Sequence, residues 1–288
     1  MIIDFHFHPF CKEATWDEID KISDAMWGLY PTQKKRMSVM LKTLATKYSI
    51  DNYIGLMDNL QIEKAIIVSF NIKTAYGAIL VNNDDLAMFI EKYPKRFIGF
   101  AGIDPPSSDA LDQLDYAINS LDLKGVKLVP PVQKFDPKNE VYNPIWEKIV
   151  DLNIPLWIHG GHQVSTAGSI AKYGHPMRID DLAMRFPEMT IIIGHMGTPW
   201  FWDTFSVVIR HPNVYVDISA HPELYQYFPW DAYTNSNIED KVLFASDHPL
   251  CHWNQIIPAV KQLPISDGFR NRIFKKNAEK LLKSFKII

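Results

Sequence analysis

The sequence predicts an α/β fold, a (β/α)8 TIM barrel with a helical insertion after the first strand. Eight short apolar segments recur along the chain, and their apolar residues run continuously instead of alternating with polar ones. Continuous apolar runs are typical of parallel strands that are covered on both faces. Amphipathic segments separate most of these runs, and strands that alternate with helices indicate a parallel barrel.

The expected strands are rich in Ile, Val and Phe, which suit a pleated and buried position. In chain order they cover residues 2–7, 64–70, 96–103, 125–130, 154–159, 190–195, 213–219 and 242–246. Helices are expected at 83–92, 107–120, 144–151 and 178–186, in a stretch after residue 198, and at 254–262 and 266–284. An open doubly wound sheet is the alternative, but no glycine-rich phosphate loop follows any expected strand.

The longest connection, residues 9–63, follows the first strand. It contains Trp16, Trp27 and Tyr30 together with helix-like stretches. We therefore expect a folded cap over the barrel mouth rather than a disordered loop. Because no linker or shift in composition divides the chain, residues 1–288 are expected to form a single domain that contains this insertion.

The charge balance argues against two classes of partner. The chain carries 30 Lys and Arg against 33 Asp and Glu, so neither nucleic acid nor an anionic membrane surface is expected to bind it. Two cysteines, Cys11 and Cys251, are too few for a disulfide framework and indicate a reducing compartment. The sequence has no signal-peptide pattern and no bilayer-spanning apolar run, so we expect a cytoplasmic protein with a small-molecule substrate.

Side chains with metal-binding or acid–base chemistry fall at the carboxyl ends of the expected strands, where barrel enzymes build their active sites. Five of the eight strands carry one: His6 and His8, Lys127, His159, His195 and Asp247. Random placement would scatter such residues over strands, helices and loops alike. The coincidence indicates a common site at one rim of the barrel.

The first strand carries two histidines in the pattern His-x-His. Side chains alternate along a strand, so His6 and His8 are expected to share one face, with Asp4 below them as an acceptor for a ligand N–H. Two imidazoles can hold a divalent cation, and His159 and Asp247 would complete a mixed nitrogen and oxygen set. An isolated His-x-His is more often structural, so the expectation rests on the joint pattern.

In order and motif, these residues resemble the amidohydrolase superfamily. The segment MRIDDLAMRFPEMTIIIGHMGTPW, from Met177 to Trp200, is similar to its amidohydrolase-2 branch, as are RFIGFAGIDP, GVKL and FASDHP. This branch contains metal-dependent hydrolases, lactonases and decarboxylases of the aminocarboxymuconate-semialdehyde and γ-resorcylate types. The resemblance suggests a homodimer. For the site it implies one divalent metal and the following roles: His6, His8, His159 and Asp247 as ligands, and His195 as the acid–base residue.

Hydrolysis of a small carboxylate, lactone, ester or amide is the favoured function, with zinc as the expected metal and manganese or iron as alternatives. Asp247 would take a proton from the metal-activated water while His195 moves protons or stabilises charge. The same set would also support non-oxidative decarboxylation of an aromatic or muconate-type acid. A non-catalytic binding barrel is disfavoured, because the four expected ligands and the acid–base residue are all present. Three further residues could contact substrate: Lys127, Arg178 and His162. For Lys127, a pairing or substrate role is favoured over a bridging metal ligand.

Overall fold

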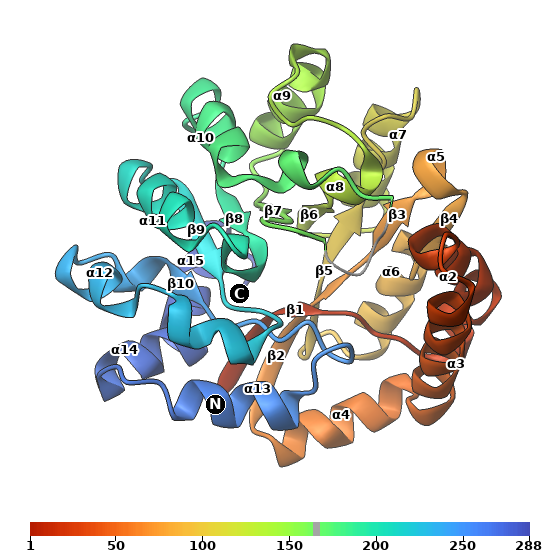
Figure 1. Ribbon diagram of the computed structural model, residues 1–288, viewed down its shortest axis with the longest axis horizontal. Helices are drawn as coiled ribbons and strands as arrows, with labels where there is room; N and C mark the ends of the chain where they lie inside the picture. Colours follow the sequence, from red (N-terminus) through yellow and green to blue (C-terminus); the bar gives the residue numbers. More distant parts are fainter. Residues whose placement is uncertain (164–167) are drawn as a thin grey trace.

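The computed structural model describes residues 1–163 and 168–288. Eight parallel strands form one sheet at the centre of the molecule, and helices surround it (Figure 1). In sheet order the strands are β1 (Ile2–Phe7), β2 (Ile62–Val68), β5 (Phe97–Gly102), β6 (Gly125–Leu128), β7 (Leu156–Ile158), β8 (Ile191–Ile193), β9 (Val214–Asp217) and β10 (Val242–Leu243). The predicted TIM barrel is confirmed, although several strands are shorter than expected.

The first strand meets the last one and closes the barrel. The backbone N–H of Phe5 donates to the carbonyl of Phe244 at 2.9 Å, and that of Asp247 donates to the carbonyl of His6 at 2.9 Å. A third bond, 2.8 Å long, runs from the N–H of His8 to the carbonyl of His248. These bonds bring the end of β1 beside the segment that follows β10, and so bring His6 and His8 close to Asp247.

Apolar residues fill both sides of the barrel wall. Inside the barrel, Phe5, Phe100, Trp157 and Ile192 belong to one buried cluster, to which residues of the last helix also contribute. A larger cluster lies between the strands and the surrounding helices. In chain order after β2 the helices are α5 (Lys73–Tyr76), α6 (Asn83–Lys92), α7 (Ala110–Asp115), α8 (Pro130–Gln133), α9 (Asn143–Asp151), α10 (Pro176–Arg185), α11 (Phe201–Arg210), α12 (Trp230–Asn235), α13 (Trp253–Lys261), α14 (Asp267–Asn271) and α15 (Asn277–Ser284). None of the helices within the described ranges has the length and apolar character needed to cross a membrane.

The insertion after β1 consists of α1 (Lys12–Thr15), α2 (Ile19–Trp27), α3 (Pro31–Lys47) and α4 (Ile50–Asn59). Ser49 and Asn52 cap the start of α4 reciprocally, and Tyr53 and Met57 pack into the core against the barrel. This helix therefore takes the usual place of the helix between the first two strands of a barrel. The α2–α3 pair lies at the edge of the molecule (Figure 1), and residues of both helices line the main cavity.

A two-stranded antiparallel sheet, which the sequence did not predict, follows β2. It pairs β3 (Phe70–Ile72) with β4 (Ala78–Leu80). Each strand has three residues, which is too short to show a period of two, and Phe70 was assigned to the end of the preceding strand. The small sheet matters for function because Phe70 and Leu80 line the main cavity.

Candidate active site

The carboxyl ends of β1 and β10 bring three potential metal ligands together. Nε2 of His6 lies 3.2 Å from Nε2 of His8, and Oδ1 of Asp247 lies 3.6 Å and 3.3 Å from those nitrogens. Ligands of a tetrahedral cation at about 2.1 Å lie roughly 3.4 Å apart, so the spacing suits a bound divalent ion. The residues present therefore fit a metal, and these three form one group whose donor atoms lie within 4.8 Å of one another.

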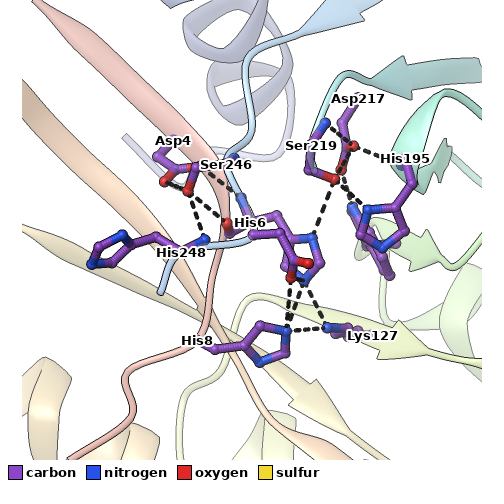
Figure 2. A network of polar contacts seen from close by, with 11 residues as sticks. Asp4, His6, His8, Lys127, His195, Asp217, Ser219, Ser246 and His248 are labelled. Carbon is purple, nitrogen blue, oxygen red and sulfur yellow. Dashed lines mark hydrogen bonds and ion pairs between the residues drawn. The ribbon is translucent and has the colours of Figure 1, made fainter. Parts of the chain in front are cut away.

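Lys127, on β6, points into the same group (Figure 2). Its Nζ lies 2.7 Å from Nε2 of His6 and 3.1 Å from Nε2 of His8. Burial lowers the pKa of this amine to about 7, although the carboxylates of Asp247 and Asp217 act in the opposite direction. Lys127 thus contacts the two imidazole nitrogens that a metal ion would use.

His159 follows β7 and is buried at the same end of the barrel. Its ring lies 4.7 Å from the ring of His195, measured between centroids. Among the described residues, Nε2 of His159 has no hydrogen-bond partner, which is costly for a buried polar atom. An unpartnered imidazole nitrogen is available as a further ligand, although it lies outside the close group of three.

Two glycines hold the turn after β7 close to the loop that follows β8. A Cβ on Gly160 would come within 2.4 Å of Cγ2 of Ile193, and one on Gly161 within 2.1 Å of the carbonyl oxygen of Thr198. The backbone N–H of His162 donates to that same carbonyl at 2.7 Å. This close backbone approach positions His159 and His162 beside the loop that carries His195.

His195 and Asp247 both adopt a left-handed backbone conformation in the segments that follow β8 and β10, with φ of 55° and 65°. Residues other than glycine rarely adopt positive φ, and such residues cluster at functional sites. The ring of His195 lies 5.2 Å from that of His6 and 5.3 Å from that of Trp157. The turn of the backbone therefore directs His195 back towards the potential ligands.

The electrostatic environment keeps the imidazoles neutral. Burial lowers the pKa of His6 and His159 well below the ordinary value and that of His8 to about 4, and the positive charge of Lys127 adds to the effect. Burial would raise the pKa of Asp247, but the hydrogen bond from His8 and the proximity of His195 and Lys127 outweigh it and lower the pKa. Neutral imidazoles beside an ionised carboxylate are the forms that bind a metal.

The hydrogen-bonded cluster that holds His195 was not predicted from the sequence. Asp217, at the end of β9, accepts hydrogen bonds from Nε1 of Trp157 at 2.5 Å and from the backbone N–H of His195 at 2.9 Å. It also accepts bonds from the hydroxyl and the N–H of Ser219, at 2.6 Å and 2.9 Å. Ser219 Oγ in turn lies 2.8 Å from Nδ1 of His195 (Figure 2). We call Asp217, Ser219, Trp157 and His195 the Asp217 cluster.

Asp4 does not act as expected. Its carboxylate accepts the backbone N–H of His6 at 3.1 Å rather than an imidazole N–H, because β1 is irregular between Asp4 and Phe7. Figure 2 shows Asp4 on the other side of β1 from the imidazole of His6. It also accepts the hydroxyl of Ser246 and the indole N–H of Trp253, both at 2.5 Å, and the N–H of Ser246 at 3.0 Å. We call Asp4, Ser246, Trp253 and His6 the Asp4 cluster.

A cavity of about 270 Å³ opens onto the potential ligands. Its polar lining includes His6, His8, Lys127, His159, His195 and Asp247, which are the residues that the strand-end pattern singled out. The remaining lining is mainly apolar and comes largely from α2, α3 and the small sheet. These apolar residues are Phe10, Ile22, Met26, Trp27, Met37, Met40, Leu41, Phe70, Leu80, Val129 and Leu250. The cavity therefore combines polar residues that could bind a metal with a mainly apolar wall.

Comparison with protein families identifies the chain. A family model described as amidohydrolase matches residues 3–283, nearly the whole sequence. The chain belongs to the amidohydrolase family. The resemblance read from the strand-end residues is thereby confirmed.

Curated relatives of this amidohydrolase include several γ-resorcylate decarboxylases. The enzyme from a Polaromonas species is 24% identical over 251 residues, which cover 70% of this chain and 74% of the relative. That from a Rhizobium species is 23% identical over 246 residues, with the same coverage. These relatives are enzymes of the decarboxylase type rather than hydrolases.

Solved structures confirm the fold of the amidohydrolase chain. An uncharacterized TIM-barrel protein from Bordetella bronchiseptica is 24% identical and covers 99% of both chains with a TM-score of 0.74. A 5-carboxyvanillate decarboxylase from Novosphingobium aromaticivorans, with bound manganese and a nitrobenzoic acid, is 21% identical. It covers 98% of this chain and 96% of its own, with a TM-score of 0.71.

The substrate-contact candidates of the amidohydrolase have different locations. Lys127 and His162 line the cavity, and His162 packs on Trp200 with ring centroids 4.7 Å apart. Arg178 is not among the described residues that line it. Near the start of α10, Arg178 instead forms an ion pair with Asp136 at 3.5 Å. The guanidinium of Arg178 is therefore engaged with Asp136, and its contact with substrate stays a prediction.

Proposed function

We propose that this amidohydrolase catalyses the non-oxidative decarboxylation of a small aromatic monocarboxylic acid. The proposed ligands of its divalent metal are His6, His8, His159 and Asp247, and His195 transfers the proton. Hydrolysis, the function that the sequence favoured, has less support, because the curated relatives are γ-resorcylate decarboxylases. Manganese is the metal we favour, since solved neighbours that act on related acids hold it.

The observation that carries this proposal is the position of His195, which lines the cavity beside the ligand group, with its ring 5.2 Å from that of His6. Its Nδ1 is turned to Ser219, so its Nε2 is left to face the cavity that the residue lines. A substrate held by an oxygen at the ligand group would bring its ring within reach of Nε2. When bound, the divalent ion would polarise that oxygen as a Lewis acid.

His195 can supply the proton that replaces carbon dioxide. Nε2 takes up a proton, either from solvent or from a ring hydroxyl next to the carboxylate, and delivers it to the ring carbon that bears the carboxylate. The electron pair of the breaking carbon–carbon bond then returns to the ring, and carbon dioxide leaves. The net reaction consumes one proton and needs no oxidant or reductant.

The lining of the cavity supports a substrate with one charged end. Lys127 is the single lysine or arginine among the described residues that line it. The opposite end, built from Met26, Trp27, Met37 and Met40, offers apolar surface rather than a second cation. We therefore propose that the carboxylate lies near Lys127 and that the ring extends towards the cap.

The proposal is tested with manganese-loaded protein and a panel of hydroxylated benzoic acids, a benzoic acid with a second carboxylate, and lactones. We expect release of carbon dioxide and the matching phenol from the monocarboxylic acids. The His195→Asn variant serves as the control and should lose this activity while keeping its metal. Ring-opened acid from a lactone, without carbon dioxide from any benzoic acid, would overturn the proposal in favour of hydrolysis.

A further inference from the structure

The hydroxyl of Ser219 contacts three functional groups at once. Its oxygen lies 2.6 Å from Oδ1 of Asp217, 2.8 Å from Nδ1 of His195 and 3.4 Å from Nδ1 of His6. The residue is completely buried, as is Asp217. No solvent can therefore replace any of these contacts without rearrangement of the barrel end.

Counting donors and acceptors leaves one consistent arrangement. A hydroxyl has one hydrogen to donate and two lone pairs to accept with. Asp217 already accepts two backbone N–H groups and the indole N–H of Trp157, none of which can accept a proton from it. The ionised carboxylate takes the hydroxyl hydrogen as its fourth bond, so both lone pairs of Ser219 remain for the two imidazoles.

Each imidazole must then carry its hydrogen on Nδ1, because it donates to an oxygen that has only lone pairs to offer. A neutral imidazole with a hydrogen on Nδ1 has its lone pair on Nε2. For His6, Nε2 is the atom that faces His8 and Asp247 in the ligand group. For His195, Nε2 is the atom left to face the cavity.

We propose that the Ser219 hydroxyl, held by Asp217, sets the tautomers of both His6 and His195. Ser219 is thus a positioning residue that prepares a ligand nitrogen on one histidine and a proton-accepting nitrogen on the other. One oxygen atom links metal binding to proton transfer. The tautomer assignment stands on the hydrogen bonds alone, whereas its effect on turnover rests on the proposed decarboxylase function.

Nitrogen NMR of the full-length protein with isotope-labelled histidine tests the assignment directly. The signals of His195 and His6 are identified from spectra of His195→Asn and His6→Asn. In the metal-free protein, before any metal can impose the result, we expect both residues to show a protonated Nδ1 and an unprotonated Nε2. A His195 signal with the hydrogen on Nε2 would overturn the proposal, and this measurement on the unaltered chain requires no variant of Ser219 to fold.

Variants of Ser219 then test whether its hydroxyl sets the tautomer of His195 or whether the residue only packs against the ring. Ser219→Ala removes the bridging oxygen and should shift His195 towards a mixture of tautomers, whereas Ser219→Thr keeps the hydroxyl and should restore the original one. Ser246→Ala is the matched control, because the described contacts of Ser246 Oγ are with Asp4 and backbone groups and include no imidazole nitrogen. It should leave the tautomer of His195 unchanged, and an equal shift in Ser246→Ala and Ser219→Ala would contradict the proposal.

Manganese affinity and turnover provide two further readouts. Ser219→Ala should bind manganese about 10- to 100-fold more weakly in competition with a chelator, as is typical when a partner of a ligand is lost. With metal at saturating concentration, kcat should fall by about 10- to 100-fold with little change in KM, since the proton-transfer group and not the substrate pocket is altered. Altered tautomers with unchanged turnover would contradict the decarboxylase role of His195 and leave the tautomer assignment intact.

Discussion

Asp4 and Asp217 are two buried carboxylates with the same set of partners. Each accepts a tryptophan indole N–H, a serine hydroxyl, the backbone N–H of that serine and the backbone N–H of a histidine. In the Asp4 cluster, the oxygen of the serine next accepts the backbone N–H of His248 at 3.0 Å. In the Asp217 cluster, it meets imidazole nitrogens instead.

The difference shows how one solution for burying a carboxylate can serve two purposes. The Asp4 cluster bonds mainly to backbone and joins β1 to the segment after β10, so it closes the barrel. The Asp217 cluster fixes a side chain that faces the cavity. The two clusters differ in the groups that donate to the serine oxygen. A backbone N–H there stabilises the fold, whereas imidazole nitrogens there position the proposed reacting group.

Metal removal should have the largest effect on turnover. The proposed ligand His6 contacts both clusters, since its N–H donates to Asp4 and its Nδ1 contacts Ser219. We expect a chelator to abolish turnover and to lower the free energy of unfolding by about 2.7 kcal/mol relative to protein at 100-fold the metal Kd. Thermal unfolding and metal analysis measure both effects. The double variant His6→Ala/His8→Ala should retain no metal, and unchanged metal content would exclude the proposed ligands.

Asparagine substitution tests the two carboxylates against each other. Asp4→Asn and Asp217→Asn each place an amide where buried donors converge, so each should lose about 2–4 kcal/mol of unfolding free energy. Turnover should separate them: roughly 10²- to 10⁴-fold lower kcat for Asp217→Asn, because His195 loses its fixed tautomer, against about 10-fold for Asp4→Asn. Urea unfolding and steady-state kinetics give the two values. Equal losses of kcat would show that the clusters do not differ in function.

Removing the indole donor from each carboxylate compares the same two clusters with a smaller expected loss of stability and activity. Trp157→Phe and Trp253→Phe each delete one hydrogen bond to a carboxylate, and each should cost about 2 kcal/mol in unfolding free energy. Trp157 packs on the ring of His6 with centroids 4.4 Å apart, so its variant should also lower kcat by about 10-fold, the lower end of the effect of losing a partner of a metal ligand. Trp253 stacks on His248 at 4.0 Å, and its variant should keep kcat near that of the unaltered enzyme.

Arg178 lies in neither cluster, so its substitution should have the smallest effect and serves as the reference for the other variants. Its ion pair with Asp136 is partly exposed, so Arg178→Ala should change the free energy of unfolding by about 0–1 kcal/mol. The KM for an aromatic acid should stay within about twofold, because Arg178 is absent from the described cavity lining. A large rise in KM would restore the sequence-based expectation that Arg178 binds the substrate carboxylate.

The fold and most of the site residues could be predicted because parallel strands deliver their carboxyl ends to one rim. His6, His8, Lys127, His159, His195 and Asp247 all line the cavity for this reason. Their roles as ligands and acid–base group remain predictions. The shape of the pocket could not be foreseen, because it depends on how α2, α3 and the small β3–β4 sheet pack against the rim.

The failures have local causes. Asp217 was missed because the apolar pattern extended its strand to residue 219, which placed the carboxylate inside the strand instead of at its end. Asp4 was assigned to the face of His6 because strict alternation was assumed, whereas β1 is irregular between Asp4 and Phe7. For Arg178, the sequence offered only the chemistry of its side chain, and its contact with substrate stays a prediction.

The left-handed conformations of His195 and Asp247 have a consequence for engineering this enzyme. Glycine adopts positive φ more readily than histidine or aspartate, so replacement by glycine at these positions should relieve backbone strain. A substitution that raises thermal stability at either residue is therefore expected to lower activity. A library selected only for survival at high temperature would enrich changes there, and would yield a more robust barrel that no longer turns over substrate.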